Sequence, residues 1–118
     1  MTVQATGEGS YSGGQLLRYA PFPSENVKQR PVDVWLPPGY DDDSGARYPV
    51  IYMHDGQNLF EPGLAYAGVD WGIDEALVRL IREGTTGGAI VVAPWNTERR
   101  RSEYMPQKPL ATPALREL

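Results

Sequence analysis

The pattern of hydrophobic and polar positions changes its period several times along the chain, and each period predicts a different element. Residues 15–19 (QLLRY) are a short strand candidate that Pro21 and Pro23 are expected to end. Residues 32–36 (VDVWL) alternate with the period of a half-buried strand. The residues that share the apolar side of that strand are Val32, Val34 and Leu36. A short polar connection joins the two strands, so we expect them to pair antiparallel.

Two near-continuous apolar runs follow, at residues 48–53 (YPVIYM) and 88–93 (GAIVVA). Such runs are typical of strands buried on both faces of a parallel sheet. Between them a helical repeat begins near Asp70 and ends near Gly84, with its apolar face formed by Ile73, Ala76, Leu77, Leu80 and Ile81. Strand, helix and strand form a βαβ unit with parallel strands. An antiparallel pair that leads into this unit predicts an α/β fold with a mixed sheet.

The remaining segments set the expected domain limits. Residues 1–14 are polar and rich in Gly and Ser, and we expect a flexible lead-in there. Residues 15–118 form the expected domain, in which 113–118 look like the start of a further helix. Two parallel strands leave a sheet poorly covered, so we expect a sheet truncated after about the fourth strand.

Composition narrows the function classes. The chain of 118 residues has a net charge of -4 and no cysteine. Mild acidity gives no electrostatic footprint for nucleic acid, and no apolar run is long enough for a membrane span, so neither is an expected partner. Residues 41–43 (DDD) lack the spacing of a calcium loop, and we expect no metal and no cofactor. The N-terminus lacks the pattern of a secretion signal, which favours a cytoplasmic protein.

Three segments resemble the putative esterase family, which includes esterase D-type hydrolases, siderophore esterases, feruloyl esterases and mycolyltransferases. They are VDVWLPPGY at 32–40, YPVIYMHDGQNLF at 48–60 and WGID at 71–74. The resemblance implies an α/β-hydrolase fold, in which the third strand delivers an oxyanion-hole loop and a Gly-x-Ser-x-Gly elbow follows the fifth. That motif does not occur in this sequence, and the nearest segment, 10–14 (SYSGG), precedes any predicted strand. The resemblance therefore implies the N-terminal half of an α/β-hydrolase domain, without the serine, acid and histidine of the triad.

The same resemblance gives roles to the HDGQN segment after residue 53. The backbone N–H of Gln57 is the best candidate donor to an oxyanion, and Gly56 would permit an unusual backbone angle and close approach of substrate. Asp55 is expected to hold the loop by accepting backbone N–H bonds, and not to be the catalytic acid. His54 precedes the place of a triad histidine, so we expect a structural or loop role for it.

The substrate-binding candidates are Asp55 and four further residues: Asn58, Trp71, Trp95 and Asn96. The last two follow a buried strand, and ligands bind at the carboxyl ends of strands in open α/β sheets. For Trp71, a role as a core or helix-entry aromatic is at least as well supported, and for Trp95, packing in the core is an equal alternative. The run Arg99–Arg101 is typical of a solvated mixed-charge loop, and the alternative is that it borders the pocket.

Three hypotheses for function follow. The first is the N-terminal part of a serine carboxylesterase that acts, as the full-length parent, on small-molecule, acyl or sugar esters. The second is a non-catalytic binding module derived from a truncated hydrolase, which self-associates through an exposed sheet edge. The third is a hydrolase that uses Ser10 or Ser12 with His54 and an aspartate. The reading frame after Leu118 distinguishes the first two.

Overall fold

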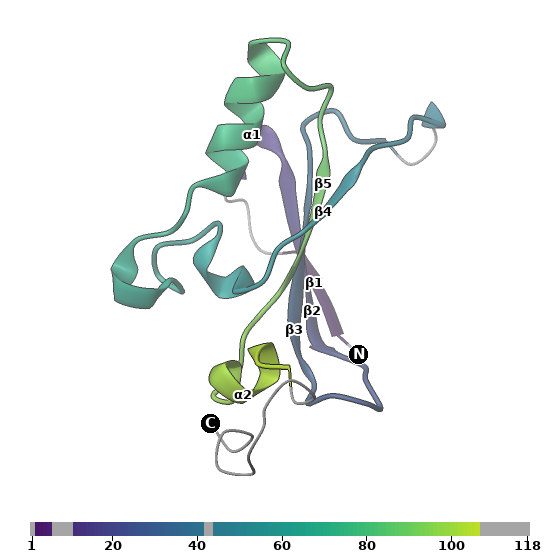
Figure 1. Cartoon of the computed structure of the whole chain (residues 1–118). Coiled ribbons are helices and arrows are strands. Elements are labelled where there is room, and N and C mark those ends of the chain that lie inside the picture. Colours follow the sequence, from purple (N-terminus) through teal and green to yellow (C-terminus); the bar gives the residue numbers. More distant parts are fainter. Residues whose placement is uncertain (1, 6–10, 42–43, 107–118) are drawn as a thin grey trace.

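A mixed five-stranded sheet organises the molecule (Figure 1). The computed structural model describes residues 2–5, 11–41 and 44–106. The strands, in the sheet order β1-β2-β3-β5-β4, are β1 Thr2–Ala5, β2 Gln15–Phe22, β3 Arg30–Leu36, β5 Ile90–Pro94 and β4 Val50–Tyr52. The helices are α1 Ile73–Arg82 and α2 Arg100–Tyr104, and the 3-10 turns are η1 Tyr11–Gly13, η3 Gly56–Asn58 and η4 Tyr66–Gly68. The small mixed α/β fold predicted from the sequence is confirmed.

Strand pairing follows the predicted scheme. β2 and β3 pair antiparallel, with Arg18 opposite Asp33. β4 and β5 pair parallel, with α1 between them in the chain. Of the two prolines expected to end the first strand, Pro21 lies within β2, and the strand ends at Phe22, directly before Pro23. The pairing with β3 is irregular between Tyr19 and Phe22, so Pro21 lies where the ladder needs no backbone N–H.

Residues 1–14, where we expected a flexible lead-in, contain two elements in their described part. β1 pairs antiparallel with β2 and extends the sheet by one strand. In η1, the backbone oxygen of Tyr11 accepts a hydrogen bond from the buried Trp35 indole at 3.1 Å. Ser10 and the helix predicted at 113–118 lie outside the described residues.

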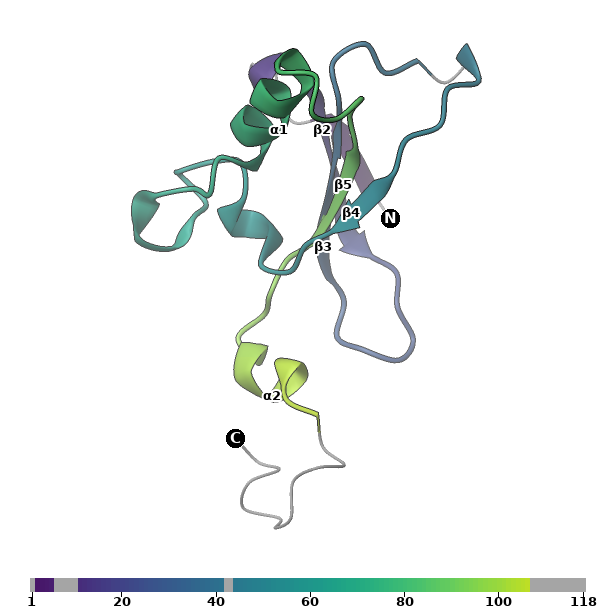
Figure 2. The same ribbon diagram turned by 45° about the horizontal axis from the view of Figure 1, so that its top comes forward.

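One face of the sheet carries the core. The turns η3 and η4 and helix α1 lie on the same side in both views (Figures 1 and 2). The buried cluster on that side contains Leu16, Trp35, Leu59, Phe60, Leu77, Val78, Val91 and Ala93. In β3 the two fully buried residues are therefore Asp33 and Trp35. The apolar side predicted for this strand faces the other way, since an open groove of the sheet is lined by Leu17, Tyr19, Val34, Leu36 and Ile90, among others.

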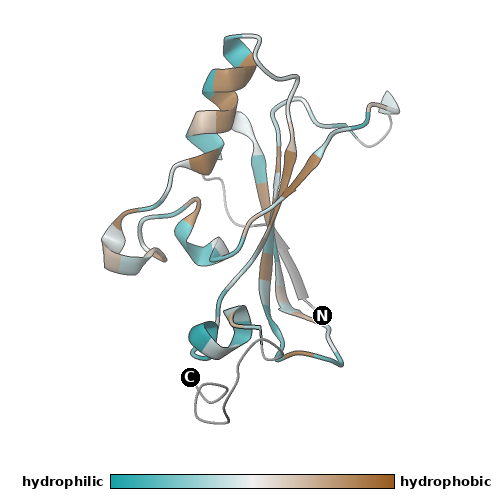
Figure 3. Cartoon of the chain, viewed as in Figure 1, coloured by the Kyte–Doolittle hydropathy of each residue, from teal (hydrophilic) through white to brown (hydrophobic). Residues whose placement is uncertain are grey.

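The prediction that residues 48–53 form a strand buried on both faces is wrong. Val50, Ile51 and Tyr52 are 43%, 38% and 76% exposed. β4 is an edge strand of the described sheet, and the described helices leave its surface open. β5 is half-buried, because Val91 and Ala93 point to the core while its alternate residues are only partly covered. Figure 3 shows hydrophobic residues on both strands.

Helix α1 spans the predicted region. It begins after Gly72, which occupies the N-cap position with φ 62° and provides no side-chain cap. It ends at Gly84 with φ 76°, where the N–H of Gly84 bonds to Ile81 O and that of Thr85 bonds to Leu80 O. This pair of bonds is the Schellman ending that favours glycine. Within the described chain, no helix combines the length and apolar content that crossing a membrane requires.

Candidate functional site

The loop after β4 has a strained backbone at Asp55. This residue has φ 61° and ψ 43°, a left-handed conformation that aspartate tolerates better than most side chains. The unusual angle expected at Gly56 is therefore found one residue earlier. Gly56 meets a different need, because a Cβ at this position would lie 2.2 Å from the backbone oxygen of Ala93. The turn η3 thus packs directly against the backbone of β5.

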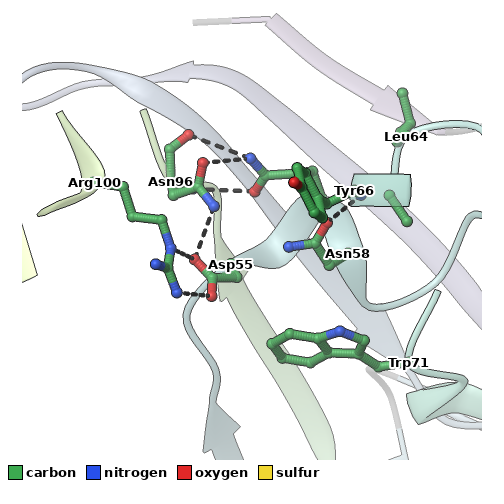
Figure 4. Close-up of a pocket in the computed structure, with 9 residues that line it drawn as sticks. Asp55, Asn58, Leu64, Tyr66, Trp71, Asn96 and Arg100 are labelled. Carbon is green, nitrogen blue, oxygen red and sulfur yellow. Dashed lines mark hydrogen bonds and ion pairs between the residues drawn. The ribbon is translucent and has the colours of Figure 1, made fainter. Parts of the chain in front are cut away.

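The carboxylate of Asp55 binds side chains from the segment after β5 (Figure 4). Its Oδ1 accepts hydrogen bonds from Asn96 Nδ2 (2.8 Å), Arg100 Nε (2.9 Å) and Tyr104 OH (3.1 Å). Its Oδ2 accepts a bond from Arg100 Nη2 at 2.8 Å. All of these donors are side chains, whereas we expected from the sequence that backbone N–H groups bind the Asp55 carboxylate. The hydrogen bond from Arg100, followed by those from Asn96 and Tyr104, holds the pKa of Asp55 well below its ordinary value of 3.8, although burial acts in the opposite direction.

Helix α2 brings Arg100 and Tyr104 to Asp55. The sequence favoured a solvated loop here, and the two residues are instead one helical turn apart on the same side of a short helix. The guanidinium of Arg100 lies 5.1 Å from the centre of the Tyr104 ring. The ring of His54, an exposed residue, also lies beside Tyr104, with 4.8 Å between the two ring centres. Burial and the bond to Asp55 raise the pKa of Tyr104. In the sequence, the spacing of four residues between Arg100 and Tyr104 indicates that the two would share one side of a helix. This spacing does not identify Asp55 as their common partner.

Gln57 and Asn96 form an amide pair across the two strand ends. Gln57 Nε2 donates to Asn96 Oδ1 at 2.7 Å, and Gln57 Oε1 accepts the backbone N–H of Asn96 at 3.1 Å. Within η3, the first bonded N–H groups are those of Asn58, to Asp55 O, and Leu59, to Gly56 O. The N–H of Gln57 comes before them, so the turn itself does not use it.

These residues border a cleft of about 570 Å³. It is lined by Asp55, Gln57, Asn58, Leu64, Ala65, Tyr66, Trp71, Asn96 and Arg100. The structure therefore brings together Asp55, Gln57, Asn58, Trp71 and Asn96 of the predicted set, and adds the η4 region. Arg100 also lines the cleft, as the alternative for the run Arg99–Arg101 had it. Trp71 is 52% exposed at this cleft, so core packing does not describe it. Apolar side chains of a loop carry no pattern in the sequence that assigns them to a cleft.

Trp95 lies outside the cleft. Its indole Nε1 donates to Asp33 Oδ2 at 2.9 Å, and the guanidinium of Arg18 lies 5.0 Å from its ring centre. Arg18 in turn binds Asp33 through Nε (2.8 Å) and Nη2 (3.1 Å). Trp95 thus forms a cluster with Asp33 and Arg18 on the sheet. The next residue, Asn96, lines the cleft.

Two other kinds of site can be compared with the geometry: a serine–histidine pair and a metal site. Ser12 donates through Oγ to Asp74 Oδ2 at 3.0 Å, whereas His54 lies against Tyr104, so serine and histidine have different partners. Among the described residues, no three side chains of His, Cys, Asp or Glu are grouped so that they could hold a metal ion.

The cleft lies at the carboxyl ends of the parallel strands β4 and β5, the edge at which ligands bind in open α/β sheets. A family model described as "Putative esterase" matches residues 24–114. The chain therefore belongs to this esterase family, and the match includes both strand ends and α2. Comparison with curated proteins gives no match.

Proposed function

We propose that this chain is part of a serine carboxylesterase of the α/β-hydrolase class and supplies its oxyanion-hole loop. Family membership supports ester hydrolysis. The strand order supports the fold class. The antiparallel strands β2 and β3 are followed in the chain by the parallel pair β4 and β5, and the HDGQN loop begins at the carboxyl end of β4. The observation that carries the proposal is the fixation of this loop: Asp55 is bound by three side chains, and Gly56 packs on Ala93.

Such fixation matters for the chemistry of ester cleavage. The tetrahedral intermediate carries a negatively charged oxygen, and losing one preorganised N–H donor raises the barrier by about 3–4 kcal/mol. A donor is effective when its position needs no rearrangement during the reaction. The N–H of Gln57 meets this condition, because the amide pair with Asn96 holds its side chain and the 3-10 turn holds its backbone.

The proposal assigns the nucleophile to polypeptide other than these 118 residues, since the sequence contains no Gly-x-Ser-x-Gly. The substrates we assign are small-molecule, acyl or sugar esters, cleaved without a cofactor. The reading frame after Leu118 gives the first test: we expect a Gly-x-Ser-x-Gly elbow followed by an acid and a histidine. A stop codon directly after Leu118 contradicts the proposal.

The second test is enzymatic. We expect the polypeptide that includes this elbow to hydrolyse p-nitrophenyl butyrate and to react with a fluorophosphonate probe at the elbow serine. The 118-residue chain alone is expected to do neither. Turnover by the chain alone, with labelling at Ser12 or Ser10, contradicts the assignment and supports the third hypothesis.

Exposure of β4 favours a second candidate, a binding module that associates with its own copies through this edge. Val50, Ile51 and Tyr52 are all exposed there, and an unpaired apolar edge is a template for strand pairing. Under this candidate the chain forms a concentration-dependent dimer in analytical ultracentrifugation, and I51K abolishes it. A monomer at all concentrations removes this candidate.

A further inference from the structure

The side-chain amide of Asn58 has one orientation in the structure. Its Oδ1 accepts the backbone N–H of Tyr66 at 2.8 Å. A backbone N–H can only donate, so the oxygen must face Tyr66 and the nitrogen must face the opposite way. The backbone oxygen of Asn58 accepts the N–H of Trp71 at 2.8 Å, which fixes the main chain as well.

The nitrogen of this amide points into the cleft. Asn58 is 9% exposed and lines the cleft, and Figure 4 shows its Nδ2 directed away from Tyr66, into the space beside Asp55 and Trp71. Among the residues that the structure describes, none accepts a hydrogen bond from Nδ2. Among the described residues, Asp74 Oδ1 is the one buried side-chain polar atom without a partner, so Asn58 Nδ2 keeps accessible surface at the cleft. An acceptor oxygen of a bound ligand can take the place of water at this donor.

The cleft also restricts the ligand's charge. The charged side chains that line it are Asp55 and Arg100, which neutralise each other through two hydrogen bonds. Leu64 and Trp71 add apolar surface. A charged ligand therefore finds no free counter-charge among these residues, and its desolvation is uncompensated, whereas an uncharged ligand has a much smaller desolvation cost.

We propose that Asn58 Nδ2 donates a hydrogen bond to the carbonyl oxygen of an uncharged ester whose apolar group lies against Leu64 and Trp71. This inference rests on the proposed esterase function. Asn58 would be a second donor beside the N–H of Gln57, in the same turn. Its bond strengthens as negative charge develops on the ester oxygen.

The substitution N58D isolates this donor. Aspartate keeps an oxygen for the N–H of Tyr66 but presents a second oxygen to the cleft. In the serine-bearing polypeptide, we expect N58D to lower kcat/KM for p-nitrophenyl butyrate roughly 100-fold or more. N26D is the matched control, because Asn26 is exposed in the β2–β3 connection and the change in charge is the same. Equal activity of N58D and N26D overturns the proposal.

A binding experiment on the 118-residue chain needs no nucleophile. Its probe is 4-phenyl-2-butanone, an uncharged ketone that cannot be cleaved, in a titration followed by ¹⁵N NMR. We expect a saturable shift of the Asn58 side-chain amide, and an affinity, read at the Trp71 indole N–H, that falls about tenfold in N58D and not in N26D. No shift of the Asn58 amide overturns the proposal. If the serine-bearing polypeptide shows no turnover, the esterase assignment fails, and this titration still decides the role of Asn58 as a carbonyl donor.

Discussion

Two aspartates, Asp33 and Asp55, are each bound by an arginine through two hydrogen bonds, yet their surroundings differ. Asp33 lies in β3 directly opposite Arg18 of β2, and the exposed fractions of the two side chains are 2% and 16%. Asp55 lies in a loop with left-handed backbone, and the side chain of its partner Arg100 is 53% exposed on a short helix. The first pair is part of a regular ladder, whereas the second ties together segments that are 45 residues apart.

The difference indicates two roles for the same chemistry. A pair buried between strands has lost its hydration, so removing one partner leaves an uncompensated charge in the core. A pair with an exposed arginine retains much of its hydration and contributes little by Coulomb attraction alone, so its main effect is to fix the loop conformation. Trp95 and Asn96 link the two pairs, since Trp95 donates to Asp33 and Asn96 donates to Asp55.

The largest expected effect is on the buried pair. D33A should lower the free energy of unfolding by about 3 kcal/mol, because Arg18 loses both hydrogen bonds to Asp33 and keeps only the longer ion pair with Glu61, at 3.6 Å. Urea denaturation measures this difference. The double variant R18M/D33L removes both charges and should lose much less; a double variant as unstable as D33A contradicts the account.

The next effect concerns the packing of the cleft loop on β5. G56A places a Cβ 2.2 Å from the backbone oxygen of Ala93, so the loop or β5 must shift. Overpacking of this kind costs roughly 1–3 kcal/mol, which thermal unfolding detects. G63A is the control, because no atom lies within 4 Å of a Cβ there. Equal stability of the two variants would show that the close approach is not required.

A smaller effect on stability is expected for R100Q, but with a clear local signal. Loss of the guanidinium should raise the pKa of Asp55 toward its ordinary value of 3.8, since Arg100 is the main cause of the lowered pKa. ¹³C NMR of the Asp55 carboxyl group measures this pKa as a function of pH. R101Q, at the exposed next residue, should leave it unchanged. A similar pKa in R100Q and the unmodified chain would contradict the assigned pairing.

The smallest effect is the pH dependence of stability that Asp55 contributes. Its pKa is lower in the folded than in the unfolded chain, so the contribution is present above the unfolded pKa and is lost as pH falls through the folded one. The difference in unfolding free energy between the unmodified chain and D55N should be constant above about pH 5 and decrease below about pH 4. Urea denaturation across this range measures it, and a difference that grows toward low pH contradicts the sign.

The sequence by itself determined the parts of the fold that depend on local periodicity. Alternation at 32–36, the helical repeat from Ile73 and the glycine at 84 predicted a strand, a helix and its end, and the structure has them. The position of Asn96 after a buried strand made it a candidate for the pocket, and the structure places it at the cleft beside Asp55 and Gln57. Such features follow from residues near one another in the chain, and their physical causes act over a few residues.

The tertiary structure alone decided which side of each strand is covered and which charges meet. A period of two shows that Asp33 and Trp35 share a face, but only the position of α1 and η3 makes that face the buried one. The same holds for β4, whose apolar run lies on an exposed edge. The pairing of Arg100 with Asp55 and the orientation of the Asn58 amide depend on contacts between distant segments, which no local pattern of residues specifies.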